Sequence, residues 1–355
     1  KARVKLRVNG ATAETRIILI VVAVIILVIC LTAIGCSAIA NRVHDTTAPN
    51  AELSVWQSYI KDDTLLRQVV IPGSHDAGTK GMAWFSETQD RDIAEQLACG
   101  TRYFDLRIKM KDGECRIHHG PAYSLYLKDI LRDVRDFLDS NPSENVILDV
   151  HKFGNAEAKP KTVELLDEYL SDKFVTRPEG VTDLEYIETL TLGEVRGKCL
   201  LIWGDMDEYS QNGDRYFLRN DDHGDVEVGC LQSFYEKNWN WYYSSSKYIK
   251  KAIPAYINKY KESKGGLFVL QAQLTDGCLI IGPRYREGGH EKNMNAGVAA
   301  MKDSEDLEYI NIIMRDFISP AKNCYTLTLN LAKGIVKDDC IDSYNTMLGD
   351  FIAVA

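Results

Sequence analysis

The chain has 355 residues, of which 26% are charged, and a formal net charge of −9. This length is enough for one large domain or two ordinary ones. The acidic balance argues against a nucleic-acid partner, because proteins neutralise the phosphates of nucleic acids with a basic face.

The first feature along the chain is an apolar segment, residues 17–40, that contains no charged residue. At 1.5 Å per residue it is long enough to cross a hydrocarbon core of about 30 Å, which predicts a single transmembrane signal anchor. The tail before it, residues 1–16, is basic, and the positive-inside rule then predicts a cytoplasmic N-terminus and a catalytic part on the extracellular or luminal side. A cleaved signal peptide is the alternative, because Ala38-Ile39-Ala40 fits a small-residue cleavage pattern.

After a stem over residues 41–54, runs rich in β-branched residues alternate with stretches of helical periodicity such as "YLKDILRDVRDFLDS". The runs predict eight strands: Val69–Ile71, Tyr103–Ile108, Cys115–Ile117, Val146–Val150, Cys199–Trp203, Val228–Leu231, Leu267–Leu270 and Ile310–Met314. Strands that alternate with helices indicate a parallel sheet. Eight of them in about 300 residues favour an α/β fold of the (β/α)8 TIM-barrel type, formed by residues 55–355 as one domain. A doubly wound open sheet is the alternative, but no glycine-rich dinucleotide loop supports it.

Polar and charged residues follow several of these strands. In a (β/α)8 barrel the catalytic groups lie just past the carboxyl ends of the strands, so these residues are expected to share one site. Five pairs stand at such strand ends: His75 with Asp76, Asp105 with Arg107, His118 with His119, His151 with Lys152, and Arg315 with Asp316. They include four of the chain's seven histidines.

Two histidines, several carboxylates and an arginine favour acid–base chemistry on an anionic group. One imidazole can accept a proton from an attacking hydroxyl while the other donates a proton to the leaving oxygen. An arginine supplies a fixed positive charge and two parallel donors, which match a phosphodiester. A metal site at His75, Asp76, Asp105 and His119 is the alternative. We expect no metal, because Arg107 projects from the same strand face as Asp105 and its guanidinium repels a divalent cation.

Four segments carry a family resemblance: "IPGSHDAGT", "QLACGTRYFDLRI", "RIHHGP" and "NPSENVILDVHKF". In this order they resemble the X-domain of phosphatidylinositol-specific phospholipase C, most closely the small bacterial type. The resemblance is strong from about Leu65 to Phe153 and weak from there to Phe317. It implies a distorted (β/α)8 barrel, in agreement with the strand pattern.

The resemblance also implies catalytic roles. His75 resembles the general base that takes the proton of the inositol 2-hydroxyl, and Asp316 the carboxylate that orients it, although Asp316 can also be read as a helix N-cap. His119 resembles the general acid for the glycerol oxygen, supported by Asp76. Arg107 stands where the calcium-dependent relatives place a metal ion.

Other positions imply head-group contacts or depart from the family pattern. Asp105, Lys152 and Tyr235 are the expected substrate-binding residues. His151, however, stands where the family has a lysine, with Lys152 one position later. The segment "LIWGDMDE" offers Gly204, Asp205 and Asp207 where the family has an arginine, and Ser233 replaces an aspartate. These departures leave the preferred head group open.

Aromatic residues raise the question of an interface with lipid. Trp84 is the expected membrane-interface residue, because related enzymes carry a tryptophan on a short helix here, and indole rings partition into the headgroup region. Trp239, Trp241, Tyr242 and Tyr243 are expected to pack under loops. His118 is expected to be structural, because adjacent strand residues face opposite ways. The acidic balance of the chain disfavours strong attraction to anionic lipid.

The residues and the resemblance together predict a phosphodiesterase. We expect a phosphatidylinositol-type phospholipase C that acts by metal-independent acid–base catalysis, with no cofactor and with a membrane phospholipid in a bilayer as its substrate. The alternatives are the same chemistry on glycosylphosphatidylinositol anchors or another lipid diester, and a catalytically silent lipid-binding module. Retention of both histidines and the arginine disfavours the silent module.

Overall fold

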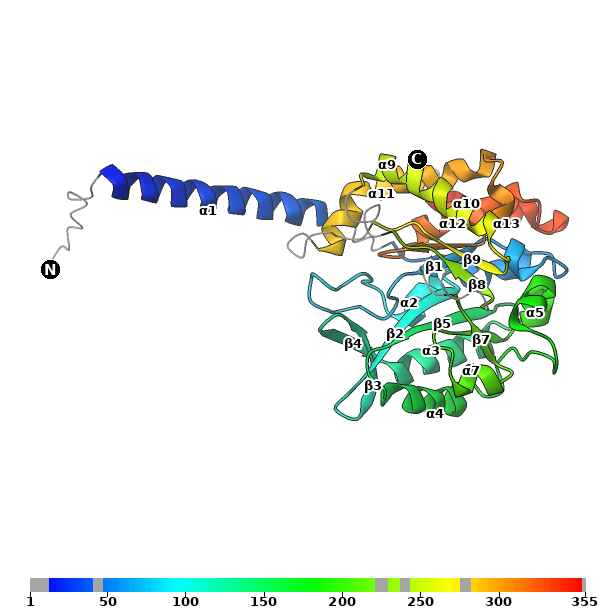
Figure 1. Cartoon of the computed structure of the whole chain (residues 1–355). Coiled ribbons are helices and arrows are strands. Elements are labelled where there is room, and N and C mark those ends of the chain that lie inside the picture. Colours follow the sequence, from blue (N-terminus) through cyan, green and yellow to red (C-terminus); the bar gives the residue numbers. More distant parts are fainter. Residues whose placement is uncertain (1–12, 41–46, 221–228, 237–242, 275–281, 353–355) are drawn as a thin grey trace.

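The computed structural model describes residues 13–40, 47–220, 229–236, 243–274 and 282–352. Its centre is a barrel of eight parallel strands in the order β7-β6-β5-β2-β1-β10-β9-β8 (Figure 1). Backbone hydrogen bonds from Cys230 to Leu218 and from Asn220 to Leu231 join β7 to β8, so the barrel nearly closes. The strands of the barrel are β1 (Ile71–Ser74), β2 (Tyr103–Lys111), β5 (Val146–Phe153), β6 (Cys199–Trp203), β7 (Tyr216–Leu218), β8 (Leu231–Ser233), β9 (Leu267–Gln271) and β10 (Ile312–Arg315).

Helices cover the outside of the barrel (Figure 1). In α3, the residues Leu127, Ile130, Leu131, Val134 and Leu138 are buried, and the charged side chains between them face away from the sheet, as the helical periodicity predicts. The helices are α1 (Ala13–Ala40), α2 (Ile93–Ala98), α3 (Leu127–Ser140), α4 (Ala158–Leu170), α5 (Asp183–Thr189), α6 (Leu192–Val195), α7 (Glu208–Asn212), α9 (Ser245–Lys247), α10 (Ile253–Glu262), α11 (Pro283–Ala300), α12 (Pro320–Ala332) and α13 (Ile341–Ile352).

The core divides according to which face of each strand a residue occupies. In β5, Ile147 points into the barrel, whereas Val146 and Leu148 pack against the surrounding helices. The interior cluster also contains Trp56 and Tyr344, which come from outside the sheet. Because the interior is filled by apolar side chains, polar groups of the strands are left for the carboxyl ends.

One of the eight predicted strands does not belong to the barrel. Residues Cys115–Ile117 lie in β3 (Glu114–His119), which pairs in antiparallel fashion with β2 and with β4 (Ala122–Tyr126). The eighth barrel strand is instead β7. It has only three residues, too few to show the alternation of apolar and polar residues that identifies a strand in the sequence. The predicted strand Val228–Leu231 corresponds to β8, and Val228 itself lies outside the described residues.

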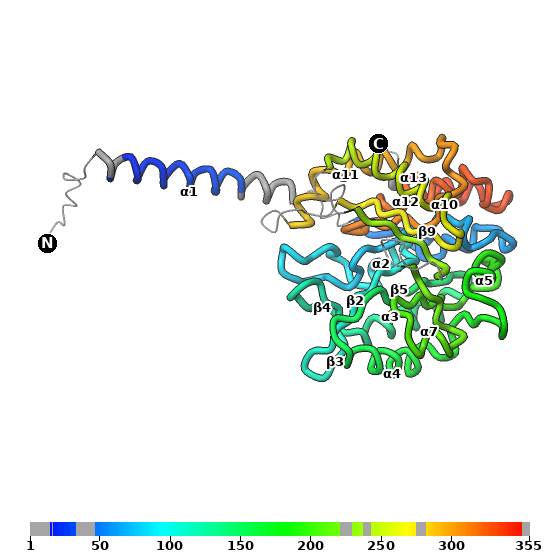
Figure 2. The backbone as a smooth tube through the Cα atoms, viewed as in Figure 1, coloured from blue at the N-terminus to red at the C-terminus, as the bar shows by residue number. Residues whose placement is uncertain are grey.

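The N-terminal segment corrects a second prediction. Residues 13–40 form α1, which extends away from the barrel, and its described apolar side chains run from Ile17 to Leu31 (Figures 1 and 2). Within the described ranges, no helix combines the length and the apolarity that a membrane crossing demands. A span takes about 20 consecutive apolar residues. The predicted anchor over residues 17–40 is therefore unsupported, and the single-pass placement with an extracellular or luminal domain is wrong. Residues 1–12 and 41–46 lie outside the described part.

Candidate active site

Four neighbouring strands bring the polar residues of the sequence analysis to one edge of the barrel. His75 and Asp76 follow β1, Asp105 and Arg107 lie on β2, and Asp316 follows β10. Since β10, β1, β2 and β5 are parallel neighbours, their carboxyl ends meet. They surround a cavity of about 350 Å³. Its walls are His75, Asp76, Thr88, Tyr103, Asp105, Arg107, His119, His151, Lys152, Arg219, Ser233, Tyr235, Gln271, Pro283, Met314 and Asp316.

His75 is held between two carboxylates. Its Nδ1 lies 2.7 Å from Asp316 Oδ1, and its Nε2 lies 3.4 Å from Asp76 Oδ2. Burial by itself lowers the pKa of His75, but the charges of Asp76 and Asp316 outweigh this effect and raise that pKa from 6.5 to about 9. Burial raises the pKa of Asp316, and His75 opposes that shift. The helix-cap alternative for Asp316 fails, because Ser319 caps α12.

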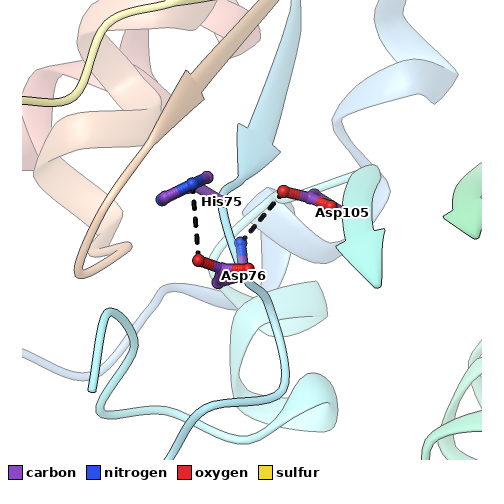
Figure 3. A group of neighbouring side chains, drawn as sticks. All are labelled: His75, Asp76 and Asp105. Carbon is purple, nitrogen blue, oxygen red and sulfur yellow. Dashed lines mark hydrogen bonds and ion pairs between the residues drawn. The ribbon is translucent and has the colours of Figure 1, made fainter. Parts of the chain in front are cut away.

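Arg107 lies among the three residues whose arrangement could otherwise hold a cation. Ligand atoms of His75, Asp76 and Asp105 lie within 4.8 Å of one another, and all three residues are buried (Figure 3). However, Arg107 Nε is 2.7 Å from Asp76 Oδ1, and its Nη2 is 3.1 Å from Asp105 Oδ2 and 3.2 Å from His75 Nε2. Burial raises the pKa of both carboxyls, but Arg107 and the neighbouring histidines together outweigh it, so that the pKa of Asp76 is lowered and that of Asp105 lies well below its usual range. These residues fit a guanidinium better than a metal ion, because both carboxylates already pair with it.

The second imidazole comes from the hairpin rather than from the barrel. His119 ends β3, and its Nδ1 donates a hydrogen bond of 2.8 Å to the carbonyl of Ser86. That bond leaves Nε2 facing the cavity, 3.7 Å from Asp76 Oδ2. The side chain of His119 is 31% exposed, against 11% for His75. A proton on His119 Nε2 is therefore accessible to a ligand in the cavity.

A β-bulge brings two consecutive residues of β5 to the cavity, although neighbours in a strand normally face opposite sides. Arg107 of β2 pairs with Lys152, whereas the preceding pair ends at Val150, so His151 is the extra residue. Both His151 and Lys152 line the cavity, and His151 Nδ1 lies 3.2 Å from Asp105 Oδ1. The predicted substrate-binding residue Lys152 and its neighbour His151 therefore both reach the cavity wall.

The barrel also supplies residues that sequence reasoning missed. Arg219 follows the short strand β7 and lines the cavity, with its Nη1 3.3 Å from the buried Asp149 Oδ2. Tyr103 OH donates to the same oxygen at 2.5 Å. The only signal in the sequence was the run "RYFLRN", which is short but has the apolar centre and basic end of the other strands. Arg219 provides an arginine on this wall, whereas Asp205 and Asp207 pair with Lys159 away from the cavity.

The remaining predicted positions differ in whether they line the cavity. Ser233 and Tyr235 line it, while His118 does not and stands beside Tyr123 on the hairpin. Trp84 is 56% exposed. Tyr243 is half-buried, and Trp239, Trp241 and Tyr242 lie outside the described residues.

Comparison with known proteins agrees with this geometry. Residues 63–203 match the family model described as phosphatidylinositol-specific phospholipase C, X domain. Over these residues the chain is similar to that family. The 1-phosphatidylinositol phosphodiesterase of Listeria monocytogenes is 31% identical over 156 residues, which cover 41% of this chain and 47% of that protein. The protein of the same name from Staphylococcus aureus (strain Newman) is 28% identical, with 45% and 54% covered. The chain thus spans about half the length of the curated relatives it matches.

The fold of the chain agrees with that of a solved structure. The phosphatidylinositol-specific phospholipase C from Listeria monocytogenes superposes with a TM-score of 0.62 at 23% identity and covers 78% of this chain and 98% of its own. A PI-PLC X-box domain-containing protein of Dictyostelium discoideum is 28% identical over 293 residues, 72% of this chain and 37% of that protein. At 23% identity, the likeness to the Listeria structure shows the fold alone.

A buried glutamine joins the turn that follows β1 to the turn that follows β10. Gln89 Nε2 donates to the carbonyls of His75 (2.9 Å) and Arg315 (3.0 Å), and its Oε1 accepts from Ile318 N at 2.9 Å. Its side chain is fully buried. Asp76 (φ 44°) and Phe317, two further residues of these turns, have positive φ values, which cost energy in a non-glycine residue. Gln89 therefore stabilises two strained turns at a fixed separation.

The elevated pKa of His75 leads to a prediction on pH. In Asp316→Asn we expect this pKa to fall from about 9, because one of its two anions is gone. The folded-state pKa exceeds 6.5, so the protonated imidazole stabilises the fold fully below pH 6.5 and this stabilisation is lost as pH rises through 9. The variant should lose less stability than the wild type between pH 6.5 and 9. NMR titration of the imidazole and urea unfolding measure both effects. Asp338→Asn, an exposed carboxylate, is the control.

Proposed function

We propose that this chain is a metal-independent phosphatidylinositol-specific phospholipase C that converts phosphatidylinositol-type lipids into diacylglycerol and inositol 1,2-cyclic phosphate. One observation carries the proposal: two imidazoles, each beside a carboxylate, flank a guanidinium in a single cavity. The names of the bacterial relatives, 1-phosphatidylinositol phosphodiesterases, support the same chemistry. Residues 55–355 form the catalytic unit in this proposal.

The first half of the reaction is attack by the inositol 2-hydroxyl on the phosphorus. His75 Nε2 takes the hydroxyl proton as the oxygen–phosphorus bond forms. This step requires the neutral imidazole, and Asp316 holds the ring so that Nε2 faces the cavity. Arg107 donates to the phosphate oxygens, whose negative charge grows in the transition state. Its two carboxylate partners keep the guanidinium in place before substrate binds.

The second half is departure of diacylglycerol. The phosphorus–oxygen bond to glycerol breaks, and His119 Nε2 gives its proton to the leaving oxygen, so that no free alkoxide forms. Asp76 Oδ2 lies 3.7 Å from His119 Nε2, the atom that gives up the proton. The product is the five-membered cyclic phosphodiester on the inositol ring. Because His75 gains one proton and His119 loses one, a return step must exchange them before the next cycle.

Residues around the reacting centre are assigned to binding. Asp105, Lys152 and Tyr235 are proposed to contact the inositol hydroxyls, with Arg219 added to that wall. The exposed Trp84 is proposed to enter the lipid headgroup region, where indole rings partition well.

The test is turnover by the full chain on phosphatidylinositol and on a glycosylated phosphatidylinositol, each with and without EDTA. Phosphorus NMR should show the cyclic phosphate, with a rate that EDTA leaves unchanged. If only the glycosylated lipid yields the cyclic phosphate, the proposed substrate is wrong and the proposed mechanism stands. If neither lipid reacts although both bind, the chain is a lipid-binding module and the proposal fails.

Gln89 offers a test of preorganisation. Gln89→Met keeps a buried side chain of similar length but removes the three hydrogen bonds between the turns. We expect kcat to fall about 30-fold with little change in KM, because small displacements of catalytic groups cost up to roughly 100-fold. Gln96→Met is the matched control: Gln96 is equally buried and donates to the carbonyls of Ala77 and Arg91, so that it binds the turn after β1 without joining it to β10. Equal losses of kcat in the two variants would mean that Gln89 is merely structural.

A further inference from the structure

The β2 strand continues beyond the barrel and forms a small antiparallel sheet with β3 and β4. The pairing runs from Ile108 with Ile117 to Lys111 with Glu114, and β4 adds a third strand. Figure 1 shows β3 and β4 on the side of the molecule away from α9 and α10. It carries His119, so its position relative to the cavity is set by the same backbone that supplies the second imidazole.

The two faces of this extension differ in chemistry. Side chains alternate along a strand, and residues directly opposite in an antiparallel pair share a face. One face is apolar and packs with α3 and α4 through Ile108, Met110, Cys115 and Ile117. Lys109, Lys111 and Arg116 belong to the other face, called the open face below, on which Lys111 is exposed and Lys109 and Arg116 are half-buried.

The open face is basic, although the chain as a whole is acidic. In the described part of the molecule, Lys109 and Lys111 pair with no carboxylate, and both lie over the ring of Tyr123, at 5.8 and 4.6 Å from its centroid. Arg116 donates to the carbonyl of Ser124 and lies 4.6 Å from the ring centroid of Tyr126.

Two acids lie on the extension. Asp112 stands in the turn of the hairpin, and Glu114 is paired with Lys128 at 2.8 Å. With Glu114 paired, the cations of the open face exceed the one remaining acid. Salt screens charges beyond about 8 Å, so this local excess outweighs the distant net charge of −9 at the surface itself.

This face continues into the cavity wall. Arg107 of β2 pairs with Lys152 of β5, and both line the cavity, while Lys109 lies two residues farther along the same face of β2. A lipid whose head group enters the cavity therefore places the head groups of its neighbours next to Lys109, Lys111 and the two tyrosines. Lysine with tyrosine is a combination that suits the interface of a membrane, because the ring reaches the headgroup level and the ammonium meets the phosphates.

We propose that the open face of the β2–β3–β4 extension docks this protein on the anionic phospholipids of a membrane, separately from the lipid being cleaved. The surface consists of Lys109, Lys111, Arg116, Tyr123 and Tyr126. The inference rests on the proposed lipid substrate for its location beside the cavity. Binding itself requires no turnover, so the two proposals can fail independently.

The experiment measures partition of the full chain onto phosphatidylcholine vesicles with and without phosphatidylserine, which is anionic. Each basic residue near an anionic surface contributes roughly fivefold to the partition coefficient. The double variant Lys109→Gln/Lys111→Gln should therefore bind phosphatidylserine vesicles about 20-fold less well than the wild type. Both should bind pure phosphatidylcholine equally, and high salt should remove the difference.

The matched control is Lys250→Gln/Lys251→Gln, which changes the charge equally. These exposed lysines lie between α9 and α10, on the other side of the barrel from β3 (Figure 1). An equal loss of binding in the control, or no loss in the hairpin variant, would overturn the docking surface. Turnover of a short-chain, monomeric phosphatidylinositol should be unchanged in the hairpin variant. If wild-type turnover is absent while selective binding persists, the proposed function fails and the docking surface stands.

Discussion

Replacing His119 by alanine is expected to lower kcat on phosphatidylinositol about 1,000-fold. A positioned general acid contributes roughly 10²- to 10⁴-fold, and the glycerol oxygen is a poor leaving group that needs a proton. The hydrogen bond from Nδ1 to Ser86 holds the ring so that Nε2 supplies this proton. Steady-state kinetics on mixed micelles measure the loss.

The leaving group provides the decisive comparison for His119. In an inositol phosphodiester with a nitrophenyl group, the leaving nitrophenolate needs no proton. His119→Ala should therefore lower kcat less than about tenfold on that substrate. His118→Ala is the control, because His118 is the adjacent residue and does not line the cavity. A loss of the same size on both substrates would contradict the assignment of His119 as general acid.

Replacing Arg107 by methionine is expected to lower kcat about 1,000-fold on both substrates. The guanidinium lies 3.2 Å from His75 Nε2, and the loss of one such donor in a preorganised site costs roughly 10²- to 10³-fold. Arg107→Lys should recover part of this activity, since a lysine keeps the charge but loses the fork that contacts both Asp76 and Asp105. Calcium-dependent turnover in the wild type would contradict the role given to Arg107.

The same variant has a signature in stability. The pKa of Asp76 and of Asp105 is depressed in the folded protein, and Arg107 is the largest favourable cause in each. A depressed carboxyl pKa stabilises the fold above about pH 4, and that stabilisation is lost as pH falls through the folded pKa. Urea unfolding should therefore show a gap between the wild type and Arg107→Met that is wide at pH 7 and narrows as pH falls below about 4. A gap independent of pH would mean that the guanidinium does not hold these carboxylates.

Much of the proposed catalytic centre could be predicted from the sequence because it is built from short segments. His75, Asp76 and Asp316 directly follow apolar strands, and Asp105 and Arg107 alternate on a single strand. Strand alternation and the edge rule for parallel sheets then place these groups together without knowledge of the packing. The barrel as a fold class follows from the same alternation of strands and helices.

The tertiary structure decided the rest, because those features depend on contacts between distant segments. Membership of β7 in the barrel, and with it Arg219, depends on pairing with β6 and not on a three-residue pattern. The bulge at His151 is a property of the register between β5 and β2.

The charge pattern shows the same division between local and distant information. Composition describes an acidic chain, and only the pairing of β2 with β3 gathers Lys109, Lys111 and Arg116 on one open face. The sequence by itself determines the residue types and their local order. Strand register, bulges and the distribution of surface charge are determined only when segments far apart in the sequence come into contact.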